Sequence, residues 1–287
     1  MCRWMAWLGQ PVLIEELLFN SPHGIVDQSL HSRMGAEPTN GDGFGLGWYG
    51  TGEGPGVYRS VSPAWGDANL RELAAHVESP LFMTHVRAAI GSPIQETNCH
   101  PFRRGNWLFV HNGFIADFHL LRRDLMLAID PEQFADVQGS TDTEVVFHLA
   151  LTFGLEEDPL AGLERAVGLV EATGRAHGIE HPVQMTIGIS NGERLWAVRY
   201  STEGHSRTLF ISQEASALRA LGHERLERLG DEDRAIVSEP LGDLEGVWLE
   251  VPESSAVIVQ PGADEQRPFR PQEPESVPTQ QTGATTW

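Results

Sequence analysis

A cysteine directly behind the initiator methionine is the residue of this chain best suited to chemistry. Its small side chain is the kind that lets Met1 be removed during synthesis, which would leave Cys2 with a free α-amino group beside its thiol. The unperturbed pKa is roughly 7.7–8.0 for a terminal amine and about 8.5 for a thiol, so the two groups can exchange a proton near neutral pH. Cys2 is therefore a candidate nucleophile that carries its own base, although position 2 alone favours a merely frayed or buried residue.

Arg87 and Asp142 are candidates for binding the charged head of a small substrate. Arg87 ends the run THVR, where its planar guanidinium could bind a carboxylate through two hydrogen bonds, although arginine is more commonly a surface residue. Asp142 lies in the run STDTE at the start of an expected helix, where it could accept hydrogen bonds from a substrate ammonium or simply stabilise the helix terminus. Position alone does not separate these roles.

Asn112 and Gly113 follow the apolar run WLFVH. The Asn112 amide and the Gly113 N–H are two neighbouring donors, and such a pair can stabilise the oxyanion that forms during acyl transfer. The alternative is a simple turn, because both residue types tolerate a left-handed backbone. Together, Arg87, Asp142 and the Asn112-Gly113 pair could hold the carboxylate, the ammonium and the oxyanion of an amino acid amide while Cys2 attacks it.

Three competing kinds of site have weaker support. Gly45, Gly47 and Gly50 satisfy the spacing G-x-G-x-x-G, but further glycines and a proline follow where a dinucleotide site needs a helix, so we expect a tight turn and a strand of small residues. His85, Cys99, His100 and His111 match no usual zinc spacing, so no metal is expected. Cys99 lacks the surroundings of a papain-like nucleophile, which makes that alternative weaker still.

Composition excludes several classes of protein. The 287 residues carry a net charge of −20, and all 20 basic residues are arginine. Without lysine there is no lysine-linked pyridoxal phosphate and no P-loop lysine, and no other cofactor is indicated. An acidic chain disfavours nucleic acids and anionic membranes. No apolar run reaches the roughly 18 residues of a membrane span, and two cysteines provide no disulfide scaffold, so a cytoplasmic location is expected.

Hydrophobic periodicity predicts strands in hairpin-like succession, with helices gathered in the middle of the chain. Strands are expected at 81–86, 107–111, 184–190, 195–200, 208–212, 247–251 and 256–260, with a hairpin turn at Asn191-Gly192. Helices are expected at 69–78, 118–129, 143–153 and 160–177, the third with a capping signature at Ser140-Thr141. This order favours antiparallel sheets covered by helices. Residues 263–287 are rich in Pro, Gln, Glu and Thr, which predicts a disordered tail.

The motifs resemble those of the class II glutamine amidotransferases, the N-terminal-nucleophile type. The resemblance covers MCRW, NGDGFGLGWY, THVR, TNCHPFRRGNWLFVHNG and STDTE in family order over the first half of the chain. Weaker similarity continues through VSEPL and the region 248–252. The chain is most similar to short, stand-alone members, including the γ-glutamyl hydrolases of ergothioneine synthesis.

The resemblance implies an α+β fold, a four-layer αββα sandwich of two antiparallel sheets, with the amidotransferase domain at residues 2–262. It implies Cys2 as nucleophile and its α-amine as base. Asn112 and Gly113 would form the oxyanion hole, and Arg87 and Asp142 would bind the glutamyl head. After Arg87 the chain reads AAIGS, without the Thr and His that supplement this arginine in several members. Carboxylate binding by Arg87 therefore rests on fewer matching residues.

Three functions remain open at this point. The first is cleavage of a γ-glutamyl amide, either glutamine or a larger conjugate, through a γ-glutamyl thioester. The second is a glutaminase subunit that passes ammonia to a separate acceptor synthetase, and the third is an idle fold acting as a binding or regulatory subunit. The expected substrate is a small γ-glutamyl amide, with no nucleic acid or membrane partner. The absence of an acceptor module favours hydrolysis, whereas the oligomeric state has no sequence signal.

Overall fold

The computed structural model describes residues 2–34, 39–89, 91–213, 219, 229–242 and 246–278. The chain divides into two compact units. Unit 1 comprises Met1–Gly113 and Gln184–Phe269, and unit 2 comprises Phe114–Val183 and Arg270–Trp287.

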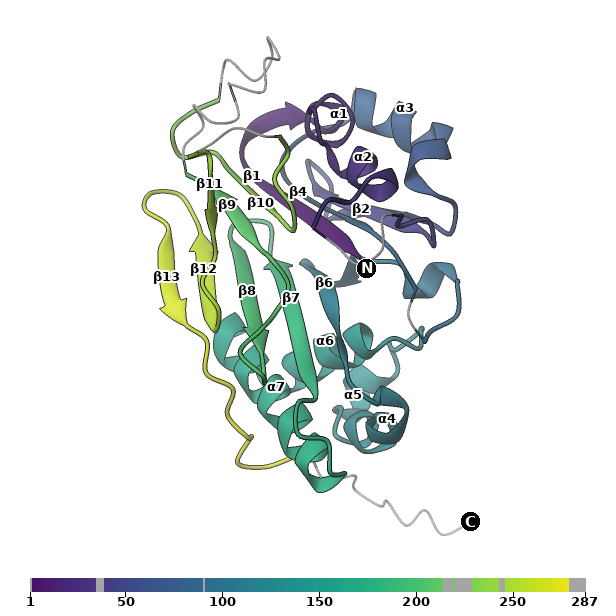
Figure 1. Cartoon of the computed structure of the whole chain (residues 1–287), viewed down its shortest axis with the longest axis vertical. Coiled ribbons are helices and arrows are strands. Elements are labelled where there is room, and N and C mark those ends of the chain that lie inside the picture. Colours follow the sequence, from purple (N-terminus) through teal and green to yellow (C-terminus); the bar gives the residue numbers. More distant parts are fainter. Residues whose placement is uncertain are drawn as a thin grey trace. The chain divides into compact units, whose positions relative to one another are not determined.

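Unit 1 contains two sheets whose described pairings are all antiparallel (Figure 1). The first sheet has the order β11-β9-β10-β1-β4-β2-β3 and comprises β1 (Arg3–Leu13), β2 (Phe44–Tyr49), β3 (Gly56–Ser60), β4 (Glu78–Val86), β9 (Phe210–Ser212), β10 (Arg234–Val237) and β11 (Trp248–Glu250). The second has the order β13-β12-β8-β7-β6-β5 and comprises β5 (Phe102–Arg104), β6 (Trp107–Ile115), β7 (Val183–Ser190), β8 (Leu195–Ser201), β12 (Ser255–Val259) and β13 (Glu265–Pro268).

The two sheets pack face to face through an apolar core. Trp4 and Met83 of the first sheet lie in one buried cluster with Val110, Ala197 and Val257 of the second. The indole N–H of Trp4 donates to the Thr186 hydroxyl over 3.0 Å, so this bond crosses between the sheets. Alternate side chains of each strand point to opposite faces, so the residues between these core positions face the other way.

The other face of the first sheet is covered by short helices. These are α1 (Ile14–Leu18), α2 (Ile25–Leu30) and α3 (Ala68–His76), which lie beside β1, β2 and β4 in Figure 1. A second buried cluster joins Leu17, Ile25 and Leu70 of these helices to Trp7 and Phe82 of the sheet. Since β1 lies between β10 and β4 and faces a core on each side, it is apolar on both faces over most of its length.

The described residues of unit 2 form four α-helices. They are α4 (Phe118–Leu127), α5 (Pro131–Phe134), α6 (Asp142–Thr152) and α7 (Pro159–Ala176), and α4, α6 and α7 pack on one another. The expected cap of the third predicted helix is confirmed, because the Thr141 side chain accepts a hydrogen bond from the Glu144 N–H over 3.2 Å. Of the described part of the chain, no helix is long and apolar enough to cross a membrane.

The C-terminal segment differs from the expected disordered tail. Residues 265–268 form β13 on the edge of β12, and Phe269 is buried against the Tyr200 ring. In unit 2, the Gln272 N–H donates to the Glu164 carbonyl of α7, and Gly168 leaves room for this backbone. The Pro- and Gln-rich composition gave no sign of this order because backbone pairing and one aromatic anchor supply it. Residues 279–287 lie outside the described residues.

Candidate active site

Cys2 precedes the first residue of β1 in the centre of the first sheet. The register pairs Arg3 with Val86 of β4, which brings Cys2 beside the residues that follow Val86. The Cys2 thiol lies 3.5 Å from the Ala88 carbonyl oxygen, which accepts its hydrogen bond. Cys2 is partly exposed, whereas Cys99 is fully buried. Of the two cysteines, Cys2 is thus the one that a substrate can reach.

Arg87 follows β4 directly and lies next to Ala88, so the structure brings Cys2 and Arg87 together. Its N–H donates to the Gly43 carbonyl over 2.8 Å, and its carbonyl accepts from the Asp42 N–H over 2.9 Å. The guanidinium donates to the Ser92 hydroxyl over 2.7 Å and to the Pro93 carbonyl over 3.2 Å. Arg87 is thus not a surface arginine, the alternative left open by the sequence, because it is buried and hydrogen-bonded to Ser92 and Pro93.

The donors that remain on Arg87 decide whether it can also bind a carboxylate. A guanidinium has five N–H groups. Besides the bonds to Ser92 and Pro93, a third bond runs from Nη1 to the Asp42 carbonyl over 3.4 Å. Among the described residues, these bonds leave Nε–H and one Nη1–H of Arg87 uncommitted. These two N–H groups lie on different edges of the guanidinium, because Nε–H shares its edge with Nη2, so each can donate one further hydrogen bond but the pair does not form a bidentate fork.

Asp42 is a positioning residue of this region that the sequence reasoning did not single out. Besides its backbone pairing with Arg87, its carboxylate accepts a hydrogen bond from the Ala89 N–H over 2.8 Å. Asp42 therefore fixes the segment that carries both Arg87 and the Ala88 carbonyl contacted by Cys2. In the sequence, Asp42 is marked only by its place in the glycine-rich run NGDG, which predicts a turn.

That glycine-rich run forms β2 and the turn before it, as expected. A Cβ at Gly45 would collide with the His100 carbonyl oxygen, and one at Gly47 would lie 2.8 Å from Leu108 and Pro101 side-chain atoms. The next regular element is the strand β3 rather than a helix. The rejection of a dinucleotide fingerprint is consistent with this order of elements.

Asn112 and Gly113 lie within β6 rather than in a turn after it, because the strand continues to Ile115. Asn112 is buried, and its carbonyl oxygen accepts a hydrogen bond from the Thr186 hydroxyl over 3.5 Å. A Cβ at Gly113 would collide with the Gln184 carbonyl oxygen and lie 2.7 Å from the Met185 Cα. Glycine is therefore required at position 113 by the close approach of β7, and the turn alternative is wrong.

Asp142 belongs to unit 2, where it is the first residue of α6. One of its carboxylate oxygens accepts a hydrogen bond from the Ile115 N–H over 2.8 Å, and the other accepts from the Thr143 N–H over 2.8 Å. Ile115 is two residues beyond Gly113 along the chain. The Thr143 hydroxyl also donates to Asp142 Oδ1, over 3.3 Å. The structure thus gives Asp142 local partners, and Oδ2 is the oxygen with a lone pair left for a further donor.

The histidine cluster, His85, His100 and His111, lies in unit 1 near Arg87. The rings of His85 and His100 are 4.0 Å apart between centroids, and His85 Nε2 donates to the His111 carbonyl oxygen over 3.1 Å. Burial, with the Arg87 charge as a smaller cause, lowers the pKa of His85 to about 3, and burial also holds the pKa of His100 well below its usual value. Both imidazoles are therefore neutral at pH 7.

The metal alternative concerns His85, Cys99, His100 and His111, all within the part of the chain that the structure describes. No group of three or more His, Cys, Asp or Glu side chains there has a geometry that could hold a metal ion. Cys99 instead donates to the Ser60 carbonyl over 3.4 Å, and burial raises the pKa of its thiol despite the nearby Arg87 and Arg59 charges. A buried thiol with a raised pKa is a poor nucleophile, which also argues against a papain-like use of Cys99.

Comparisons with known proteins identify the family. The chain matches the family described as glutamine amidotransferases class-II over residues 18–265. It is 31% identical over 292 residues to the probable glutamine amidotransferase DUG3 of Saccharomyces cerevisiae, over 91% of this chain and 82% of the relative. It is also 28% identical over 265 residues to the gamma-glutamyl-hercynylcysteine sulfoxide hydrolase of Mycolicibacterium smegmatis, over 91% of this chain and 96% of the relative.

A solved structure agrees with these relatives. A class-II glutamine aminotransferase domain protein from Silicibacter pomeroyi superposes with a TM-score of 0.73 and 33% identity, over 95% of this chain and 100% of that one. The chain therefore belongs to the class II glutamine amidotransferases and is an enzyme of this class, and the predicted α+β fold with two antiparallel sheets is confirmed. The family match begins at residue 18, so Cys2 lies before the matched range.

Proposed function

We propose that the protein hydrolyses a γ-glutamyl amide, with Cys2 as the nucleophile. The observation that carries this proposal is the placement of a partly exposed thiol at the start of the central strand β1, beside the buried and immobilised Arg87. The relatives support the reaction class, because one of them is named as a hydrolase of a γ-glutamyl conjugate and spans nearly the whole chain.

The reaction would proceed through a thioester. The α-amine of Cys2, freed by removal of Met1, takes the thiol proton, and Sγ attacks the γ-carbonyl carbon. Asn112 and the Gly113 N–H stabilise the oxyanion of the tetrahedral intermediate. Collapse of this intermediate breaks the C–N bond, and the leaving amine takes up the proton held by the Cys2 α-ammonium. Water then hydrolyses the γ-glutamyl thioester and releases glutamate. Arg87 and Asp142 hold the α-carboxylate and α-ammonium of the glutamyl group throughout.

The test uses untagged protein with glutamine and with γ-glutamyl amides of larger amines, comparing wild type with Cys2→Ala and the matched variant Cys99→Ala. Loss of the nucleophile should remove essentially all turnover, by analogy about 10⁴-fold or more. Cys99→Ala should retain most of it, since Cys99 only fills a buried position. The intact mass of the active protein should lack methionine, and a γ-glutamyl adduct should appear on Cys2.

Three outcomes decide between the functions. Turnover of larger γ-glutamyl amides supports the hydrolase. Exclusive turnover of glutamine that rises on adding a separate synthetase would replace it by the ammonia-delivering subunit. Binding of γ-glutamyl amides without turnover or adduct would leave only a binding or regulatory role.

A further inference from the structure

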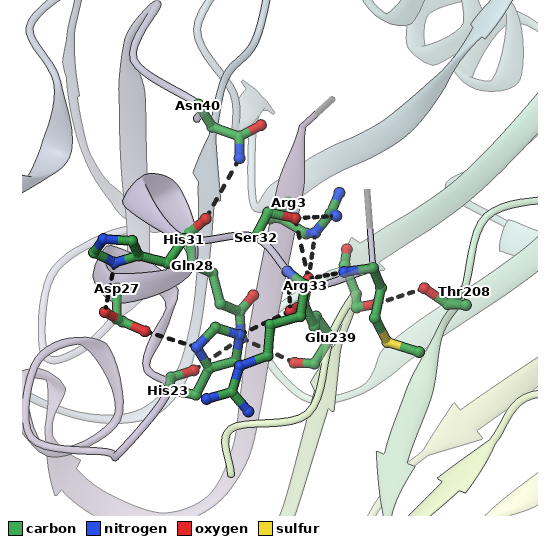
Figure 2. Close-up of polar contacts among 12 residues, drawn as sticks. Arg3, His23, Asp27, Gln28, His31, Ser32, Arg33, Asn40, Thr208 and Glu239 are labelled. Atoms are coloured by element: carbon green, nitrogen blue, oxygen red, sulfur yellow. Dashed lines mark hydrogen bonds and ion pairs between the residues drawn. The ribbon is translucent and has the colours of Figure 1, made fainter. Parts of the chain in front are cut away.

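The guanidinium of Arg3 binds the residue proposed as the nucleophile. Its Nη1 donates to the Cys2 carbonyl oxygen over 2.8 Å, its Nε donates to Glu239 Oε2 over 3.0 Å, and its Nη2 donates to the Ser32 hydroxyl. Figure 2 shows the contacts of Arg3 with Ser32 and Glu239. Arg3 and Glu239 are 3% and 1% exposed, so the ion pair is shielded from water and its geometry is fixed by the surrounding chain.

Glu239 is held opposite Arg3 by the pairing of β1 with β10. The register pairs Met5 with Val237, and Ser238 continues it by exchanging hydrogen bonds with Trp4. Glu239 then falls opposite Arg3. Its carboxylate also accepts hydrogen bonds from the backbone N–H groups of two residues in the segment after α2, Arg33 over 2.7 Å and Met34 over 3.3 Å.

His23 and Asp27 extend the contacts of the Glu239 carboxylate. His23 Nε2 lies 2.8 Å from Glu239 Oε1, and His23 Nδ1 lies 2.7 Å from Asp27 Oδ2 (Figure 2). Burial opposes the charge on Glu239, but the hydrogen bonds from His23, Arg33 and Arg3 outweigh it and lower the pKa of Glu239 to about 2. We call Arg3, His23, Asp27 and Glu239 the Glu239 network.

Folding stability alone does not explain why an ion pair is buried at this position. A buried ion pair loses hydration that its mutual attraction only partly restores, and apolar replacements of similar volume are often as stable. The contact that an apolar residue could not supply is the Nη1 bond to the Cys2 carbonyl. This bond restrains rotation about the Cα–C bond of Cys2. That rotation determines where the α-amine and the Sγ of Cys2 point relative to the sheet.

We propose that Arg3 is a positioning residue for Cys2, and that Glu239 holds the Arg3 guanidinium in the orientation that fixes the Cys2 carbonyl. The inference rests on the proposed function in one respect, since it takes Cys2 as the nucleophile. The network would act on the direction of attack and would leave the affinity for the glutamyl group unchanged, because no member of the network belongs to the residues proposed to hold that group.

The test compares Arg3→Lys with the matched control Arg234→Lys. Lysine keeps the charge of Arg3 but cannot reach the Cys2 carbonyl, Ser32 and Glu239 together. Arg234 lies on the neighbouring strand β10 and pairs with Asp264 over 2.7 Å, without a bond to Cys2. Arg3→Lys should lower kcat by about 100-fold, as expected for a misplaced reacting group, with KM changed by less than about twofold. Arg234→Lys should retain wild-type kcat.

A second readout separates positioning from local unfolding. The Cys2 thiolate attacks the small electrophile iodoacetamide and displaces iodide, and this reaction needs no substrate held in one orientation. Cys2 of the Arg3→Lys variant should therefore be alkylated at close to the wild-type rate, with Cys99 still protected. A rise in KM together with faster alkylation of both cysteines would instead show a loosened fold and overturn the proposal. Ser32→Ala removes only one partner of the guanidinium and should fold normally, with a loss in kcat of a few-fold and unchanged KM.

The outcomes also separate this inference from the proposed function. If wild type turns over γ-glutamyl amides and both Arg3→Lys and Ser32→Ala retain its kcat, only the positioning role is overturned. If wild type forms no product and no adduct on Cys2 with any γ-glutamyl amide, the proposed function fails and the positioning role fails with it. Loss of kcat at constant KM in Arg3→Lys, with Arg234→Lys unaffected, supports the proposal.

Discussion

The Glu239 network and the histidine cluster each bury an imidazole, and they shift its pKa in opposite directions. His23 is 1% exposed and His85 is fully buried, yet the pKa of His23 is raised and the pKa of His85 is lowered to about 3. For His23, burial again disfavours the charge, but its hydrogen bonds to Glu239 and Asp27 outweigh burial. For His85, one carbonyl bond does not outweigh burial and the Arg87 charge.

The difference shows that burial alone does not decide the charge of an imidazole here. The deciding feature is whether a carboxylate faces the ring. Two carboxylates flank His23, whereas His85 faces the His100 ring and a backbone carbonyl. Opposite charges within hydrogen-bond distance favour the ionised form, and desolvation favours the neutral one. The start of β1 thus carries the buried Arg3–Glu239 ion pair, whereas His85 and His100 near Arg87 are neutral.

The largest loss of stability should come from removing the charge of Glu239, the carboxylate that Arg3 and His23 share. Glu239→Gln leaves Arg3 and His23 buried without their shared carboxylate, so the free energy of unfolding should fall by about 3–5 kcal/mol at pH 7 in denaturant titrations. The matched control is Glu250→Gln, whose carboxylate is half-exposed and pairs with Arg199. An exposed pair contributes about 0–1 kcal/mol, and the control should lose no more than this.

The pH dependence of that difference has a defined sign. The folded-state pKa of Glu239, about 2, lies below the ordinary value of 4.5, so its contribution is present above pH 4.5 and is lost as the pH falls toward 2. The stability gap between wild type and Glu239→Gln should therefore narrow below pH 4.5. A gap that stays constant down to pH 3 would contradict a charged, paired Glu239.

A smaller effect is expected for His23→Gln, which removes the charge and one of the two ring contacts. Hydrogen bonds to charged groups contribute about 2 kcal/mol, and a loss of that size is expected at pH 6 by thermal or denaturant unfolding. Because the folded-state pKa of His23 is raised, its contribution is complete below pH 6.5 and is lost as the pH rises through the raised value. The gap to wild type should thus shrink at alkaline pH.

The exposed neighbour His31 provides the control for this variant. His31 pairs with the same Asp27 over 3.2 Å, but its side chain is 72% exposed. His31→Gln should change stability little at any pH, as is usual for exposed pairs. Equal losses in His23→Gln and His31→Gln would show that burial adds nothing to the His23 contacts.

The smallest change is expected in the histidine cluster, where His85 and His100 should not become protonated near neutral pH. Imidazole nitrogen shifts measured by NMR should show His85 neutral from pH 8 down to pH 5, since its pKa is about 3, and His100 should show no midpoint near its ordinary value of 6.5. The His23 resonance should titrate with a midpoint above its ordinary value of 6.5. A His85 midpoint near its ordinary value of 6.5 would remove the contrast between the two regions.

Strands and helices with clear hydrophobic periodicity were predicted correctly from the sequence. The four expected helices match α3, α4, α6 and α7, and the Asn191-Gly192 hairpin joins β7 to β8 with Gly192 at φ 94°. The central strand β1 was not predicted. It is buried on both faces, so it lacks the alternation of a one-sided strand, and Gly9 and Pro11 interrupt its pattern where the β1–β4 register shifts. The four-residue strand β10 is too short to show a period.

Part of the candidate site was predictable because its residues lie in compact motifs. Cys2, Arg87 and Asn112 each occur in a short run whose order along the chain resembles the family, and the family is confirmed. Glu239 was not singled out, because it is one of 40 acidic residues and its partner Arg3 lies 236 positions away. Only the register of β10 against β1 shows that the two side chains meet.

The indole of Trp4 links the two strands that carry the proposed nucleophile and oxyanion donor. Trp4 lies two residues from Cys2, its N–H binds the Thr186 hydroxyl, and that hydroxyl donates to the Asn112 carbonyl. Gly188 makes room for the ring, since a Cβ there would lie 2.9 Å from it. The Trp4 ring, with Met83 and Val110 beside it at Gly188, thus contributes to the spacing of the two sheets at this point.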